Sequence, residues 1–154
     1  MKFYMSSLSL FMEVVNTVKP GRLLGLKVGT KYVGVAVSDT NYELASPYCV
    51  MEKKDNNIGE IASELKSLAM DVNKFRYDLD NTKILKGVKC ACWEEGFASE
   101  QAACVMHPFK FDAEKEPQIL HKLAATGMLQ AYLDAVNRAK KDRETKHMPS
   151  ENIW

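Results

Sequence analysis

Two short apolar runs in the first third of the chain predict a β-hairpin. Leu23–Val28 and Tyr32–Ser38 are rich in leucine and valine, and they flank the short connection Gly29–Lys31. Alternating apolar runs joined by a glycine-bearing connection are typical of a tight hairpin. Successive side chains of a strand point to opposite faces, so Lys27 lies on the face opposite to Leu26.

The remaining pattern predicts one more strand, several helices and a late strand. Apolar residues spaced by three and four predict the helices, and Gly87, Pro108 and Pro117 mark helix boundaries. The expected elements are a helix within 1–18, a strand over Ala45–Val50, helices over 58–69 and 71–86, a strand over Val88–Trp93, and helices over Ser99–Met106 and 117–139. We therefore predict an α/β fold, with a single domain over residues 1–141 and a flexible polar tail over 142–154.

Composition fits this single domain and limits the classes of partner. The chain has 154 residues, 46% of them hydrophobic and 27% charged, which excludes wholesale disorder. Its net charge of +1 gives no overall attraction to nucleic acid, so any basic surface is local. Candidate basic groups are Lys19, Arg22 and Lys31, then Lys83, Lys86 and Lys89, and finally Arg138, Lys140, Lys141 and Arg143. For the last group, a solvated helix face is the simpler interpretation.

The sequence shows no membrane or export signal. No apolar run approaches the roughly 20 residues of a membrane span. The first 18 residues lack the charged start and small-residue cleavage site of a signal peptide, and Glu13 with no arginine disfavours a transit peptide. We expect a reducing compartment, the cytoplasm first, with an organelle or the nucleus as alternatives. We expect no membrane partner, and a monomer or weak dimer.

Cysteine and histidine residues offer one alternative site, for structural zinc. Cys90, Cys92, Cys104 and His107 are four potential ligands, but common zinc ribbons separate paired cysteines by two residues. Cys90 and Cys92 fall in a predicted strand, where buried cysteine acts as a small hydrophobic residue. We therefore prefer to interpret Cys90 and Cys92 as buried hydrophobic residues.

Four segments resemble the YqgF family, the Holliday-junction-resolvase-like or pre-16S rRNA nuclease family. Gly25–Asp39 resembles its D-x-G-x-[KR]-x-x-G-x-A-x-S-D motif, and Ala45–Pro47 follows as in the family. Trp93–Ser99 resembles D-E-R-L-[ST]-[ST], and Leu120–Leu133 resembles D-x-x-A-A-x-x-[IL]-L-x-x-[YF]-L. The resemblance spans residues 21–138 and is strongest to the plant branch. It implies a ribonuclease-H-like fold.

The same resemblance implies a nuclease site whose acids are partly replaced in this chain. In the family, carboxylates from the first strand, the D-E-R turn and the last helix hold Mg²⁺ or Mn²⁺, which activates water at a phosphodiester. The matching positions here are Lys27, the pair Glu94 and Glu95, and His121, and Gly96 replaces the family arginine. An ammonium group repels a divalent cation, and imidazole is a poor ligand for Mg²⁺. We therefore expect that no metal is bound and that catalysis is impaired.

One family strand is also absent from the sequence. The family has an apolar strand ending in G-x-P after its first helix, whereas here Met70 runs directly into residues 71–86. We predict that Val88–Trp93 moves inward to pair with Leu23–Val28 and gives a four-stranded sheet. The alternative is a splice or gene-model variant that folds poorly.

Three functions remain open at this point. The first is retained nuclease activity on structured DNA or an rRNA precursor. The second is a non-catalytic nucleic-acid or protein-binding module, in which Lys27 pairs with Glu94 or Glu95 and Lys31 and Arg22 contact nucleic acid. The third is an actin-like ATPase, suggested by the Gly-Thr turn after the first strand. That class needs a second phosphate loop and two domains, for which the chain is too short.

Overall fold

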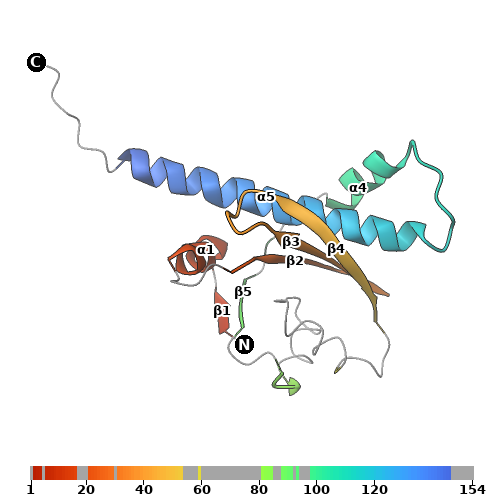
Figure 1. Cartoon of the computed structure of the whole chain (residues 1–154), viewed down its shortest axis with the longest axis horizontal. Coiled ribbons are helices and arrows are strands. Elements are labelled where there is room, and N and C mark those ends of the chain that lie inside the picture. Colours follow the sequence, from red (N-terminus) through yellow and green to blue (C-terminus); the bar gives the residue numbers. More distant parts are fainter. Residues whose placement is uncertain are drawn as a thin grey trace, which may run out of the picture.

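The computed structural model describes residues 2–4, 6–16, 21–29, 31–53, 59, 81–84, 88–91, 93 and 98–146. In these ranges the elements are β1 (Lys2–Tyr4), α1 (Ser7–Val15), β2 (Leu24–Val28), β3 (Tyr32–Ser38), β4 (Ala45–Glu52), β5 (Lys89–Ala91), α4 (Ala98–Met106) and α5 (Glu116–Lys146) (Figure 1). The helices expected over 58–69 and 71–86 lie outside the described residues, apart from short pieces. The predicted mixed α/β class is confirmed, and the arrangement is consistent with a ribonuclease-H-like fold.

The predicted hairpin and third strand form a three-stranded antiparallel sheet in the order β2-β3-β4. Its tight turn is closed by the Gly29 N–H, which donates to the Tyr32 carbonyl oxygen at 2.8 Å. The register places Lys27 directly opposite Gly34, and a shift between Val35 and Ala36 interrupts the pairing of β3 with β4. The hairpin prediction is confirmed to within one residue at each strand end.

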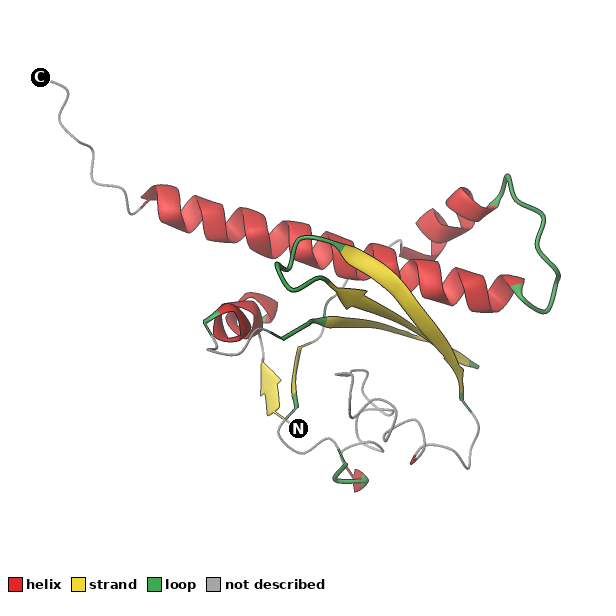
Figure 2. Ribbon diagram, viewed as in Figure 1, coloured by secondary structure: helices red, strands yellow, loops and turns green. Residues whose placement is uncertain are grey.

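Helix α5 lies along one face of this sheet (Figure 2). A Cβ atom on Gly25 would lie 2.7 Å from Leu129 Cβ, so the helix approaches the strand more closely than a larger residue allows. Ala125 and Leu133 of α5 are fully buried, as is Ala36 of β3. The absence of side chains at the sheet glycines thus sets the distance between sheet and helix.

The N-terminal segment differs from the single helix expected within residues 1–18. Strand β1 comes first, and α1 begins only after Ser6, whose hydroxyl accepts a hydrogen bond from the Ser9 N–H at 3.4 Å. Phe3 and Tyr4 have aromatic side chains that favour strands, and the helical spacing of apolar residues starts only at Leu8. A serine cap therefore separates two elements where the pattern predicted one.

Strand β5 does not join β2, so the predicted four-stranded sheet is wrong for the described residues. Instead β5 pairs in parallel with β1, with Phe3 opposite Cys90, in a separate two-stranded sheet. Figure 1 shows these two short strands side by side. Strand β1 thus provides the backbone hydrogen-bonding partner of β5, a role that we expected β2 to have.

Helix α5 also continues beyond its predicted end and includes residues expected to belong to the tail. It runs to Lys146, and its last turns project past the sheet (Figure 1). Lys140 and Glu144 lie one turn apart with 3.9 Å between Nζ and Oε1, and Arg143 and Lys146 complement the helix dipole in the last turn. These interactions are local to the helix and favour its extension. No helix in the described ranges is both long and apolar enough to span a bilayer.

Tyr132 of α5 forms a hydrogen bond to α1, and the titration of its phenol provides a test of this contact. Its side chain is 8% exposed, its hydroxyl donates to the Ser7 carbonyl oxygen at 2.7 Å, and its ring packs edge-on against Phe11 and Trp93. Burial raises the pKa of Tyr132 from 10.0 to about 12. In the folded state, burial thus favours the neutral form of the Tyr132 phenol.

We expect Tyr132→Phe to lower the free energy of unfolding by about 1 kcal/mol at neutral pH, because the Ser7 carbonyl loses its donor. In the parent chain the Tyr132 contribution is complete below pH 10 and is lost as pH rises toward about 12, because the unfolded chain ionises first. Urea unfolding at a series of pH values measures both effects. The advantage of the parent chain should disappear and then reverse as pH rises from 10 toward about 12, and a constant difference across the range would contradict the burial.

Candidate functional site

Lys27 lies in the middle of β2, on the face that α5 covers. Its direct partner across the hairpin is Gly34, and paired residues of antiparallel strands share a face. A Cβ atom on Gly34 would collide with the carbonyl group of His121, so this face looks onto α5. The Lys27 side chain is partly buried. At the position where the resemblance calls for an acid, the chain therefore carries a lysine on the face of the sheet that α5 covers.

His121 approaches the same part of the hairpin from α5. Its imidazole Nδ1 lies 2.8 Å from the Pro117 carbonyl oxygen, which fixes the ring orientation. The ring packs edge-on against Tyr32 with centroids 5.9 Å apart, and its Nε2 is the atom nearest to where a Cβ of Gly29 would stand. Lys27 is thus the strand partner of Gly34, and the backbone of His121 lies over Gly34. The structure brings these two positions together.

Further charged and aromatic side chains surround the end of the hairpin. We call Lys31, Tyr32, Glu52, Lys53 and His121 the hairpin-tip cluster. Lys31 Nζ lies 5.1 Å from the Tyr32 ring centroid and 3.6 Å from Glu52 Oε1. Lys53 Nζ donates to the Gly29 carbonyl oxygen at 3.2 Å. Interaction with the Tyr32 phenol, and then with the Glu52 carboxylate, raises the pKa of Lys31 above its ordinary value of 10.5, so this cation stays charged at neutral pH.

The other residues predicted for the site are placed differently. Arg22 is exposed and precedes β2, at the opposite end of that strand from Lys31, so the two do not form one surface. Glu94, Glu95 and Gly96 lie outside the described residues. Lys53 was missed by the sequence reasoning, although the antiparallel course of the third strand brings the end of that strand back to the hairpin tip.

The donor atoms at this place do not fit a hard divalent cation. Mg²⁺ and Mn²⁺ prefer carboxylate and carbonyl oxygen ligands, but the described site offers the Lys27 ammonium and the His121 imidazole. Nor do the described residues contain three His, Cys, Asp or Glu side chains grouped around a common point. For the zinc alternative, Cys90 is buried in β5, Cys104 is exposed on α4, and Cys92 is not among the described positions.

The three-stranded antiparallel sheet packed against a long helix is consistent with the ribonuclease-H-like fold. Sequence comparison confirms the resemblance to one family within that class. The chain is 27% identical to a protein named "Putative pre-16S rRNA nuclease" from Caldicellulosiruptor saccharolyticus, over 136 residues that cover 75% of this chain and 99% of the relative. The homologues named in the same way from Syntrophus aciditrophicus and Staphylococcus aureus are 27% and 26% identical and are covered to 92% and 97%. No family model matches the chain.

The extent of these alignments also bears on the absent strand. The alignment to the first relative has 136 positions and covers 99% of that relative. It covers only 75% of this 154-residue chain, which is fewer than 136 residues. The alignment therefore contains positions of the relative that have no counterpart here. This supports an internal loss relative to the family, as expected from the missing G-x-P strand.

Proposed function

We propose that this chain binds structured nucleic acid, an rRNA precursor before branched DNA, and does not cleave it by the metal-dependent reaction expected of its relatives. The observation that supports this proposal is that Lys27, in β2, and the backbone of His121, in α5, both lie next to Gly34. At these positions the resemblance calls for two of the carboxylates that hold the metal. With a fixed positive charge in their place, the site attracts a phosphate directly.

The surroundings of the site support binding through phosphates. Lys31 and Lys53 stand at the hairpin tip beside the imidazole of His121, with Glu52 as the counter-charge. Phosphate contacts from lysine supply affinity without base specificity. The names of the relatives point to pre-16S rRNA as the class of nucleic acid, which we extend to this chain as part of the proposal.

The proposal is tested by binding and cleavage assays on one substrate. A labelled pre-rRNA hairpin is titrated with the protein at several salt concentrations, without metal, and is then incubated with Mg²⁺ or Mn²⁺. We expect salt-sensitive binding and no cleavage. The double variant Lys31→Ala, Lys53→Ala should lower the slope of log affinity against log salt by about one to two.

The matched control is Lys115→Ala, an exposed lysine of the α4–α5 loop that is not part of the hairpin-tip cluster. Equal losses in the control and in the double variant would show that binding is not located at the hairpin tip. Cleavage that disappears in the Glu94→Gln, Glu95→Gln variant would instead establish a retained nuclease.

A further inference from the structure

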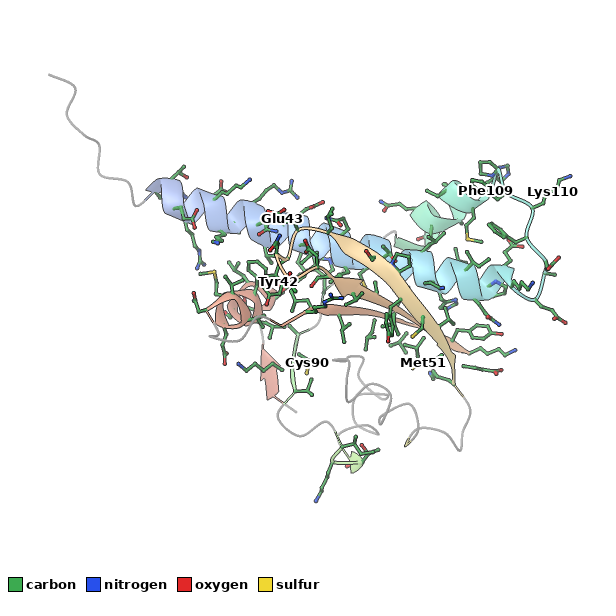
Figure 3. The ribbon with its side chains drawn as sticks, in the orientation of Figure 1. Tyr42, Glu43, Met51, Cys90, Phe109 and Lys110 are labelled. Atoms are coloured by element: carbon green, nitrogen blue, oxygen red, sulfur yellow. The ribbon has the colours of Figure 1, made fainter. Side chains whose placement is uncertain are left out.

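An exposed apolar patch lies at the end of α4 and in the loop that leads into α5, outside the hairpin-tip cluster. It consists of Val105 on α4 and Phe109 and Phe111 in the loop that follows, and we call it the α4–α5 patch. These side chains are 62%, 63% and 38% exposed, and the two phenyl centroids are 6.0 Å apart. Figure 3 shows Phe109 and Lys110 at the far end of α4, on the outside of the molecule.

Among the residues that the structure describes, packing does not cover this patch. Helix α4 buries its inner side, Ala102 and Met106, and Ala102 packs with Ala124 of α5. The outer side therefore presents Val105 to solvent. The loop is held by backbone hydrogen bonds, since the Phe109 N–H donates to the Met106 carbonyl at 2.9 Å and the Lys115 N–H to that of Asp112 at 2.9 Å. The aromatic pair is thus displayed on a fixed backbone, which lowers the entropic cost of binding a partner.

The charges around the patch identify the partner's chemistry. Between residues 100 and 116 the chain carries four acids, Glu100, Asp112, Glu114 and Glu116, all exposed, but only two lysines. One of the lysines, Lys115, lies 3.4 Å from Asp112. Two adjacent aromatic rings beside Lys110 would suit stacked bases, but the acidic surroundings repel a phosphate backbone. The same acids attract a cationic partner.

We propose that the α4–α5 patch docks a basic amphipathic helix of a partner protein, whose apolar side chains cover Phe109 and Phe111 and whose lysines or arginines face the surrounding acids. This surface is opposite in charge to the basic hairpin tip, and the proposal does not rest on the nucleic-acid binding described above.

The test uses a defined probe and the full chain. A labelled amphipathic helical peptide of leucine and lysine is titrated by fluorescence anisotropy against the parent chain, the double variant Phe109→Ser, Phe111→Ser, and the control Leu44→Ser. Leu44 is 65% exposed but lies before β4, away from the patch. We expect the double variant to lose at least tenfold in affinity and the control to bind as the parent does. The triple variant Asp112→Asn, Glu114→Gln, Glu116→Gln should lose several-fold in affinity and most of the salt dependence.

Several outcomes would overturn the proposal. One is no binding of the leucine–lysine peptide, or equal binding to the Phe109→Ser, Phe111→Ser variant. Another is equal binding of a matched leucine–glutamate peptide. Binding of a single-stranded oligonucleotide that the phenylalanine variant abolishes would assign the patch to nucleic acid. Self-association in sedimentation experiments that the same variant abolishes would assign it to a second copy of the chain. Thermal melts verify that these surface variants are folded.

Discussion

Replacing Gly34 with alanine is expected to lower the free energy of unfolding by about 3 kcal/mol, at the upper end of the usual cost of overpacking. The added methyl group would meet the carbonyl carbon and oxygen of His121 and would lie 3.0 Å from the Lys122 nitrogen. These are backbone atoms of α5, which cannot rotate away as a flexible side chain can. The helix must therefore move off the sheet, and this motion opens the packing around Ala125 and Leu129.

Equilibrium unfolding in urea measures this loss, and a second glycine of the chain provides the control. Gly127 lies inside α5 with nothing within 4 Å of the position of its Cβ. Gly127→Ala should therefore raise the free energy of unfolding by up to about 1 kcal/mol, as alanine does in an exposed helix interior. If Gly34→Ala unfolds at the same urea concentration as the parent chain, then α5 does not pack against β3 as described.

Restoring the two acids, Lys27→Asp with His121→Asp, is expected to create a site for Mn²⁺. Lys27 lies beside Gly34 in the sheet and His121 lies over Gly34 on α5, so two carboxylates would start from neighbouring positions between sheet and helix. Their mutual repulsion favours a divalent cation between them. We expect Mn²⁺ to bind at least about tenfold more tightly than to the parent chain, or about 1.4 kcal/mol.

Isothermal titration calorimetry with Mn²⁺ provides the measurement. The control is the variant Lys110→Asp, His107→Asp, which makes the same change of charge in the exposed α4–α5 loop. An equal gain in both variants would mean a general effect of charge. Absence of any gain in the Lys27→Asp, His121→Asp variant would mean that the two positions no longer form the geometry of a metal site.

The parts of the fold that were predicted correctly depend on local patterns. The alternation in Leu23–Val28 and Tyr32–Ser38 sets the faces of both strands, and the glycine between them sets the turn, so β2 and β3 follow without knowledge of the rest of the chain. The buried stretch of α5 is similarly visible in the spacing of its apolar residues. In these elements the spacing of the hydrophobic residues and the local residue types indicate the same structure.

The pairing of β1 with β5 was not predicted because it depends on backbone hydrogen bonds between two three-residue segments. Such short segments carry too few side chains to show a period. The end of α5 was missed for a related reason, since residues 140–146 are held by local polar contacts that a search for apolar spacing does not detect.

For the candidate site, the sequence indicated which residues stand at the acid positions but not what surrounds them. Lys27 and His121 were found through the resemblance, and the register of β2 with β3 then places them around one glycine. The role of Lys53 depends on the end of β4 returning to the hairpin tip, which follows only from the three-dimensional pairing.

The parallel pairing of β1 with β5 has a consequence for how the chain is made. Residues 2–4 leave the ribosome before their partners at 89–91, which are synthesised only after the hairpin and β4. The hairpin strands can pair early, because their contacts are close in sequence, whereas the first strand must wait for a partner far along the chain. Fusions at the N-terminus should therefore affect the yield of folded protein more than its final stability. Until β5 has been synthesised, β1 lacks this strand partner, and at this stage the nascent chain is most prone to aggregation.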